Sequence, residues 1–380
     1  MFLSTFLASA VLPGLVLGQV TGSATGFASG VTGGGDAEPV TPTTLEELEG
    51  YLTDAEPRVI LVDHLFDFAA ASANITEDGC RPDSNTCPGQ GQDALDGPDW
   101  CSPDYPVVPV TYNEAAQNPI HVASDKSLVG VGSEGVLKGK GLYLSEGASN
   151  IIIQNIHITD LNPQYIWGGD AITLVGTDMV WIDHCKFSLI GRQMIVSGYD
   201  PAGRVTISNS EFDGETSWSA SCNNDHYWTM LLLGEDDQIT LMNNYFHDVS
   251  GRAPKVGSEG NMVVHAVNNL FSNNQGHDFD VTTGGNVLIE GNVFSAVDTP
   301  IYPPADDTGN VFNVPEGSES QCVAYLGRDC IANTVTDSGE WPVYDNADAL
   351  SALGNGTLVE PMEVIEVEEY VLGNAGIGLL

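Results

Sequence analysis

The central part of the chain repeats one pattern of apolar and polar positions. From residue 150 onward, a run of mostly apolar residues is followed by one or two polar residues, mostly Asn, and then by an apolar or aromatic residue. The six copies read NIIIQNIHI, MVWIDHCKF, RVTISNSEF, QITLMNNYF, VVHAVNNLF and NVLIEGNVF. The apolar runs have the length of strands and lack a helical period. A strand-forming unit that recurs in this way predicts a solenoid.

Two columns of residues align when the six copies are superimposed. Because Asn and Gly tolerate left-handed backbone angles, we expect the polar column at tight corners, with Asn amides hydrogen-bonded from coil to coil. We expect the apolar column to stack inside the fold. The polar column is Asn155, His184, Asn209, Asn243, Asn268 and Gly291, and the apolar column is Ile158, Phe187, Phe212, Phe246, Phe271 and Phe294.

These columns predict an all-β fold, a single-stranded right-handed parallel β-helix. The alternative, an antiparallel β-sandwich, gives no reason for one register to recur six times. Successive members of the apolar column are 29, 25, 34, 25 and 23 residues apart. The two longest intervals predict loops inserted between coils, and long loops of this kind commonly carry the functional site. We therefore expect long loops that form a substrate groove.

The N-terminal part of the chain differs from the repeats. Residues 1–18 are apolar and uncharged, which predicts a secretory signal peptide. Residues 19–40 are rich in Gly, Ser, Thr and Ala and predict a flexible mature N-terminus. A short helix is expected next, with Thr43 or Thr44 as its N-cap, and RVILVDHLFDF then reads as a strand. Residues 41–380 form the predicted β-helix catalytic domain, and no further stretch is long and apolar enough to span a bilayer.

Secretion changes the interpretation of the cysteines. In an oxidising compartment six of the seven can pair and one is left over, whereas no tight CxxC spacing suggests zinc. They are Cys80, Cys87, Cys101, Cys185, Cys222, Cys322 and Cys330. Asn74 and Asn355 begin glycosylation sequons, which are usable only in a secreted protein. We therefore expect an extracellular glycoprotein.

The charge is strongly acidic, with 52 Asp and Glu against 11 Lys and Arg and a net charge of −41. Such a surface excludes nucleic acid as a partner and disfavours an anionic polysaccharide unless a local basic patch or a bound cation offsets the field. Two of the few cations, Arg252 and Lys255, stand three residues apart on either side of Pro254. An exposed salt bridge across a turn is one interpretation of this pair, and a catalytic role is the other.

Five short motifs resemble those of secreted pectin lyases, which belong to the pectate lyase superfamily. In chain order they are WGGDAITL, VWIDH, IGRQ, HYW and GRAPKV. The resemblance extends from about residue 40 to near the C-terminus, and the order and spacing of the motifs match as well. It implies an enzyme that cleaves methyl-esterified galacturonan by β-elimination, with plant cell-wall pectin as its partner.

The resemblance also implies roles for four residues. Arg252 corresponds to the base that removes the C5 proton, whereas an ordinary Arg stays protonated. We expect the nearby Lys255 and Arg192 to favour the neutral form of Arg252 and to stabilise the charge that develops at the C6 carbonyl. Arg192 is expected to pair with Asp170.

Asp170 resembles one calcium ligand of the pectate enzymes, but Gly168 stands where those enzymes carry another carboxylate. One carboxylate makes a poor calcium site, since the ion takes six to eight oxygen ligands. We therefore expect no metal and no other cofactor.

The resemblance places aromatic residues along the groove, where they stack on sugar rings and methyl esters. These residues are Trp100, Tyr105, Trp167, Tyr227 and Trp228. It also implies the disulfides Cys80–Cys101, Cys87–Cys222 and Cys322–Cys330, which leave Cys185 as a free thiol. Trp181 and Trp218 are more consistent with packing.

Three other functions compete with this interpretation. A calcium-dependent pectate lyase is disfavoured by Gly168 and Arg192. A catalytically silent β-helix that only binds pectin is disfavoured by the complete set of charged residues. A hydrolase needs clustered carboxylates, and the one dense candidate, 235–237, is expected to be a solvated turn. Nothing in the sequence implies an oligomer, so we expect a monomer.

Overall fold

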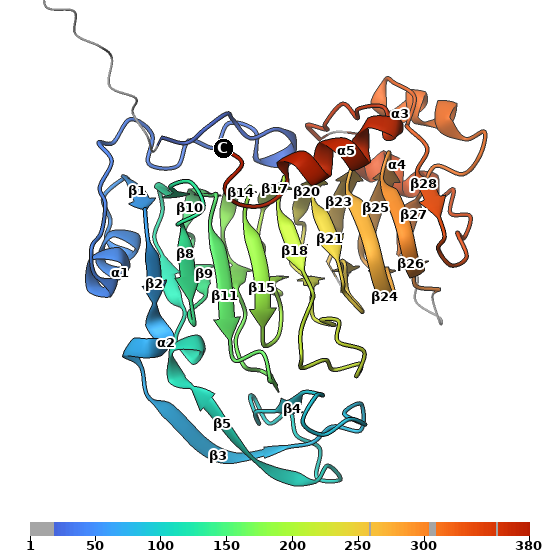
Figure 1. Ribbon diagram of the computed structural model, residues 1–380. Coiled ribbons are helices and arrows are strands. Elements are labelled where there is room, and N and C mark those ends of the chain that lie inside the picture. The colour runs from blue at the N-terminus through green and yellow to red at the C-terminus, as the bar shows by residue number, and fades with distance from the viewer. Residues whose placement is uncertain (1–18, 258–259, 304–308, 355) are drawn as a thin grey trace, which may run out of the picture.

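The computed structural model describes residues 19–380 except 258–259, 304–308 and 355. The predicted signal peptide and the sequon residue Asn355 lie outside the described residues. Parallel strands stack side by side from β1 to β27 along one axis, so the predicted parallel β-helix is confirmed (Figure 1). Among the helices that the structure describes, none has the length and apolar character needed to cross a membrane.

Three parallel sheets form the walls of the solenoid. The first sheet consists of β1 (Arg58–Val62), β7 (Lys126–Gly130), β10 (Ser149–Gln154), β14 (Asp178–Asp183), β17 (Arg204–Ser208), β20 (Gln238–Met242), β23 (Met262–Val267), β25 (Gly285–Glu290) and β27 (Asn310–Phe312). The second consists of β2 (Leu65–Asp67), β8 (Val136–Lys138), β11 (His157–Leu161), β15 (Lys186–Ile190), β18 (Glu211–Asp213), β21 (Tyr245–His247), β24 (Leu270–Val281), β26 (Val293–Ile301) and β28 (Thr334–Thr336). The third, called the groove sheet below, consists of β6 (Ile120–Val122), β9 (Leu142–Ser145), β13 (Ile172–Val175), β16 (Ile195–Ser197), β19 (Met230–Leu232), β22 (Lys255–Val256) and the end of the long β24.

Each coil contributes one strand to each sheet, as β14, β15 and β16 do in succession. The predicted apolar column is in register from coil to coil, and all six side chains are fully buried. The rings of Phe212, Phe246, Phe271 and Phe294 stack with centroids 4.5, 4.9 and 4.6 Å apart. This ladder fills the centre of the main core.

The predicted polar column lies at the corners between the first and second sheets. All six residues have positive φ, between 45° and 62°, as the corner interpretation required. The amide ladder, however, is one residue further along. Asn244 donates to Asn269, Asn269 to Asn292 and Asn292 to Asn333, at 2.9 to 3.0 Å. These buried amides satisfy one another inside the coil, so the expected hydrogen-bonded stack exists in the neighbouring column.

The prediction of a flexible N-terminus is corrected by the structure. Residues 19–40 have little regular structure beyond η1 (Gly26–Ala28), but they pack along the first sheet and bury Phe27, Ala28 and Val31. The backbone N–H groups of Phe27 and Ala28 donate to the hydroxyls of Thr240 and Thr206. Trp181 lies beneath the segment as a packing residue, as expected.

The short elements outside the three sheets cover the ends and one side of the solenoid. Helix α1 (Leu45–Thr53) has Thr44 as its N-cap, as predicted, and buries Leu48 and Leu52. The predicted strand after α1 is divided into β1 and β2. The other helices are α2 (Phe68–Ala71), η2 (Glu114–Gln117), η3 (Glu319–Cys322), α3 (Val323–Leu326), α4 (Ala347–Leu353) and α5 (Val364–Asn374). A small fourth sheet projects beside the coils and consists of β3 (Asn74–Cys80), β4 (Asp93–Ala94), β5 (Val107–Asn113) and β12 (Tyr165–Ile166) (Figure 1).

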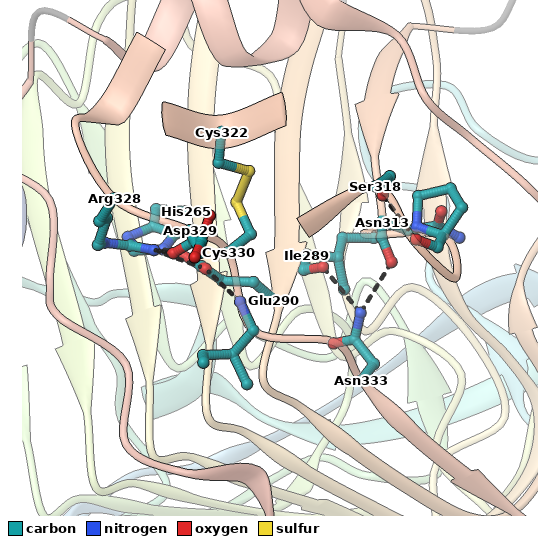
Figure 2. Close-up of a disulfide and its surroundings, with 12 residues drawn as sticks. His265, Ile289, Glu290, Asn313, Ser318, Cys322, Arg328, Asp329, Cys330 and Asn333 are labelled. Carbon is teal, nitrogen blue, oxygen red and sulfur yellow. Dashed lines mark hydrogen bonds and ion pairs between the residues drawn. A yellow bond between two sulfur atoms is a disulfide. The ribbon is translucent and has the colours of Figure 1, made fainter. Parts of the chain in front are cut away.

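The loop that the Cys322–Cys330 disulfide ties covers the outer face of the first sheet at its C-terminal strands, where it packs with Val263 and Leu288 (Figure 2). Arg328 of this loop pairs with the fully buried Glu290 of β25 at 2.5 Å, and Glu290 also contacts His265 of β23 at 2.7 Å. Burial opposes ionisation of this carboxyl, but the hydrogen bonds from His265 and Arg328 outweigh it and lower the pKa of Glu290 to about 2. The loop is therefore held on the first sheet by a buried charge network as well as by a disulfide.

Candidate active site

The candidate site residues share one position in successive coils. Asp170, Arg192, Trp228 and Arg252 each come two or three residues before a strand of the groove sheet, namely β13, β16, β19 and β22. Those strands are consecutive parallel neighbours. Side chains that precede them therefore gather at one edge of the sheet. Two of the connecting loops are those predicted from the long repeat intervals.

Arg192 and Asp170 form a bidentate ion pair beside a hollow. Nε and Nη2 of Arg192 donate to the two carboxylate oxygens at 2.9 and 2.5 Å, and the Gln193 N–H donates to the same carboxylate at 2.9 Å. The guanidinium lies over the ring of Trp167 at 3.6 Å. These groups line a hollow of about 380 Å³ on the groove sheet. The predicted Arg192–Asp170 pair is thus present in the structure.

Arg252 has a different environment. Its guanidinium lies 4.7 Å from the ring centre of Trp228 and 5.5 Å from that of Tyr227, and its backbone has a positive φ of 52°. The amide orientation of Gln193 that satisfies both neighbours lets its oxygen accept from Nη1 of Arg252 at 3.1 Å. The Nε atom of Arg252 is buried without a hydrogen-bond partner among the described residues.

Burial is the main cause that lowers the pKa of the Arg252 guanidinium from its ordinary value. Arg192 lowers it further, whereas Tyr227 and Asp280 oppose the shift. Lys255 and Arg192 are the cations expected to favour the neutral form, and Arg192 contributes to the lowered pKa. Lys255 is paired with Asp280 at 2.7 Å and Arg192 with Asp170, so those carboxylates offset part of the field from the two cations.

The charge pairing sets Arg252 apart from every other cation. Ten of the eleven Lys and Arg residues lie within ion-pair distance of a carboxylate. Arg252 has no such partner within the part of the chain that the structure describes. An arginine that is removed from water usually pairs with a carboxylate. In a protein with 52 acidic residues, a guanidinium that is largely buried and unpaired lacks the partner that would stabilise its charged form.

The groove wall beside these charges is aromatic. Trp100, Tyr105, Trp167 and Trp228 pack in one cluster with Cys80 and Cys101. Nε1 of Trp228 donates to the buried Gln92 at 2.9 Å. The disulfides Cys80–Cys101 and Cys87–Cys222 tie the loops that carry these residues. The predicted stacking residues are therefore brought together around the two arginines.

Comparison with known proteins identifies the family. The pectate lyase family model matches residues 110–324. The chain is also 52% identical to "Probable pectin lyase F" from Aspergillus flavus, with 92% of this chain and 81% of that protein covered. This chain belongs to the pectate lyase family. It is 48% identical to "Probable pectin lyase E" from Aspergillus fumigatus, with 92% of each protein covered.

Solved structures of more distant proteins agree on the fold. Pectate lyase Bsp165PelA from Bacillus sp. N165, crystallised in complex with trigalacturonate, is 18% identical with a TM-score of 0.61, covering 94% of this chain and 99% of that one. A pectate lyase from Acidovorax avenae subsp. citrulli is 17% identical with a TM-score of 0.60, covering 99% of each chain. At these identities the likeness concerns the fold alone.

A pectate lyase family member raises the question of a calcium ion, and the residues present do not fit one at Asp170. Both oxygens of that carboxylate already accept hydrogen bonds from Arg192. A side chain at Gly168 would bring its Cβ to 2.4 Å from the carbonyl oxygen of Asn162, a distance at which the backbone must shift. The second carboxylate of the pectate enzymes therefore has no room at Gly168.

Sequence reasoning missed several residues that complete the site. Gln193 contacts Arg252, Gln92 holds Trp228, and Asp280 pairs with Lys255. His277 lies edge-on to Tyr227, with ring centroids 5.7 Å apart. Lys255 lies beside Asp280 because β22 and β24 pair in that register. The sequence alone does not reveal this register.

The other predicted features are the disulfides, the sequon at Asn74 and the acidic run 235–237. All three disulfides match the implied pairing, and Cys185 is free and buried, with its pKa raised to about 12 by burial. Asn74 of β3 is exposed, as a sequon requires. We expect residues 235–237 to form a solvated turn, and Asp237 is an exception. It is fully buried and accepts hydrogen bonds from the N–H groups of Ala202 and Gly203.

Proposed function

We propose that this protein is a calcium-independent pectin lyase. It cleaves α-1,4-linked, methyl-esterified galacturonan by β-elimination and releases 4,5-unsaturated oligosaccharides. The observation that carries the proposal is Arg252, a largely buried guanidinium without a carboxylate partner among the described residues and with a lowered pKa. The names of the relatives at about 50% identity support the same activity.

Arg252 acts as the base in the proposed reaction. In its neutral form it takes the proton from C5 of the galacturonate, which the adjacent C6 ester makes acidic. The C5–H electron pair forms the C4–C5 double bond, the C4–O4 bond breaks, and the departing oxygen acquires a proton from water. A lowered pKa increases the fraction of Arg252 that is neutral and able to accept the proton.

Lys255 and Arg192 stabilise the negative charge that develops on the C6 carbonyl oxygen. Their pairing with Asp280 and Asp170 holds both cations in fixed orientations. Charged donors that are already oriented need not reorganise during the reaction, which is the main source of electrostatic catalysis. The aromatic residues Trp100, Tyr105, Trp167, Tyr227 and Trp228 stack on the sugar rings and methyl esters of pectin.

The neutral charge of a methyl-esterified substrate is also compatible with the acidic composition of the protein. A methyl-esterified chain carries no charge to be repelled by a protein of net charge −41. Calcium has no role in the proposal, because Arg192 takes the place of the cation beside Asp170. Secretion is part of the proposal as well, supported by three disulfides, which persist in oxidising compartments. We expect the enzyme to act as a monomer.

The test is the ultraviolet absorbance of the unsaturated product. Highly methylated pectin and polygalacturonate are each incubated with the enzyme, with and without a chelator. We expect absorbance to rise on methylated pectin and to be unaffected by the chelator. A rise confined to polygalacturonate with calcium would assign the protein to the pectate enzymes instead. Binding without any rise would indicate a silent pectin-binding β-helix.

A further inference from the structure

A row of outward-facing side chains continues along the groove sheet away from Arg252. The strand registers pair six positions in succession, one from each strand. On β13 and β9 the residues on either side of the row, such as Ile172 and Leu174, are fully buried, so the row itself faces outward. The positions are Lys255, Leu231, Val196, Thr173, Tyr143 and His121.

The character of the row changes along its length. It begins at the paired cation Lys255, continues through Leu231, Val196 and Thr173, and ends in two rings. The rings of Tyr143 and His121 lie 4.9 Å apart and are tilted by 48°. His121 is exposed and Tyr143 is half-buried. An aromatic face that remains accessible beside apolar side chains is suited to the apolar face of a sugar ring.

The row is long enough to contact a polymer at two separate places. His121 is five strands away from Lys255 in the groove sheet, which corresponds to about 24 Å at the usual strand spacing. The hollow of about 380 Å³ is lined by Val196, Thr173 and Tyr143. A second hollow, of about 300 Å³, begins at His121. One hollow therefore lies beside Arg192 and a second lies at the far end of the row.

The second hollow indicates which sugar is accepted there. Besides His121, its lining includes the side chains of Thr53, Ser124 and Ser145, and the one Asp, Glu, Lys or Arg that lines it is Glu146. A carboxylate beside the hollow disfavours a free uronate, and no Lys or Arg of the lining compensates. A methyl-esterified unit has no such repulsion.

We propose that His121, at the end of the row, forms a distal subsite for a methyl-esterified galacturonate unit, several sugar units away from the bond that is cleaved, and that Tyr143 links this subsite to the hollow beside Arg192. This inference rests on the proposed pectin lyase function. The subsite increases the affinity for long, highly esterified chains and takes no part in the elimination itself. Short oligosaccharides bound at Arg252 do not reach it.

The experiment compares Tyr143→Ala and His121→Ala with the wild-type enzyme on short and on long methyl-esterified oligogalacturonates. Control variants are Tyr325→Ala and His64→Ala, which remove exposed rings of the same types elsewhere on the surface. We expect kcat/KM on long chains to fall roughly two- to tenfold, through KM, in the test variants only. Rates on short chains stay unchanged in His121→Ala, which also shows that this variant is folded, whereas Tyr143→Ala, at the hollow beside Arg192, is assessed by its binding of the long chain.

Equal losses on short and long chains in His121→Ala, or no loss on long chains, would overturn the subsite. Binding of methylated pectin is measured in parallel in the Arg252→Ala background, where turnover does not interfere. There, Tyr143→Ala is expected to weaken binding of the long chain by a similar factor. If the wild-type enzyme forms no unsaturated product at all, the proposed function fails, whereas the binding comparison still decides the subsite.

Discussion

At the residue scale, the main feature is one cation, Arg252, that has no counter-charge among the residues that the structure describes. Arg192 and Lys255 are each fixed by a carboxylate, whereas Arg252 is surrounded by Trp228, Tyr227 and the amide of Gln193. These neighbours exclude water without supplying the negative charge that would keep the guanidinium protonated. Arg252 therefore differs from the paired cations Arg192 and Lys255, and this difference supports its proposed role as the base.

Replacing Arg252 tests that role directly. We expect Arg252→Ala to lower kcat by roughly 10²- to 10⁴-fold, the usual contribution of a positioned base. KM should change little, because the aromatic wall and the Arg192–Asp170 pair remain. The control is Arg204→Ala, which removes an exposed arginine paired with Asp178. Initial rates from product absorbance measure both variants, and an Arg252→Ala enzyme with wild-type turnover would contradict the proposed mechanism.

At the element scale, the coil depends on two residues per repeat. A corner residue with positive φ starts the turn, and a ring three positions later stacks inside. Both columns were predictable because backbone tolerance and apolar character belong to the residue itself. The amide ladder was misplaced by one position, since hydrogen-bond partners depend on which side chain points inward at the corner.

Other parts of the structure depend on contacts that the sequence does not reveal. The N-terminal segment has no periodic pattern, and its partners Thr206 and Thr240 are about two hundred residues away. Asp280 is one of 52 acidic residues, and nothing local marks it as the partner of Lys255. Asp170 and Arg192 were found because their motifs resemble those of a known family.

The Phe ladder gives a prediction about stability. Phe246 is fully buried and stacks on Phe212 and Phe271. We expect Phe246→Ala to lower the free energy of unfolding by about 3–5 kcal/mol, because a cavity would open between two stacked rings. Tyr199→Ala, at an exposed position, should stay within about 0.5 kcal/mol of wild type. Urea unfolding measures both, and similar losses in the two variants would argue against the ladder as a stabilising element.

At the scale of the whole molecule, the solenoid has two ends that must be closed. Helix α1 covers the first coils with Leu48 and Leu52. At the other end Trp341 packs against Phe294, the last ring of the ladder, with ring centroids 5.0 Å apart. Beside it, Arg328 attaches the Cys322–Cys330 loop to the outer face of the last coils by reaching the buried Glu290. An open end would expose the Phe ladder and the edges of the sheets, so end closure is needed for solubility as well as for stability.

The attachment of the Cys322–Cys330 loop to Glu290 predicts a dependence of stability on pH. The pKa of Glu290 is lowered from its ordinary value of 4.5 to about 2, so its ionised form stabilises the folded protein above pH 4.5. That stability is lost as the pH falls toward 2. We expect Arg328→Met to cost about 3–5 kcal/mol at neutral pH, because a buried carboxylate loses its partner. The loss should be smaller near pH 2.

Unfolding by urea at several pH values measures this effect. Arg204→Met, which breaks the exposed pair with Asp178, is the matched control and should cost about 1 kcal/mol or less. A loss for Arg328→Met that does not change between neutral and acidic pH would assign its effect to packing instead of charge.

The pairing of the cations has a consequence for movement through the plant cell wall. Ten of the eleven cations are held by the protein's own carboxylates, and the eleventh is largely buried in the groove. Over the part of the chain that the structure describes, the outer surface therefore offers no unpaired cation by which stretches of de-esterified pectin would retain the enzyme. Regions that have lost their esters repel it, and esterified regions do not. The enzyme is thereby kept free to diffuse toward the polymer that it is able to cleave.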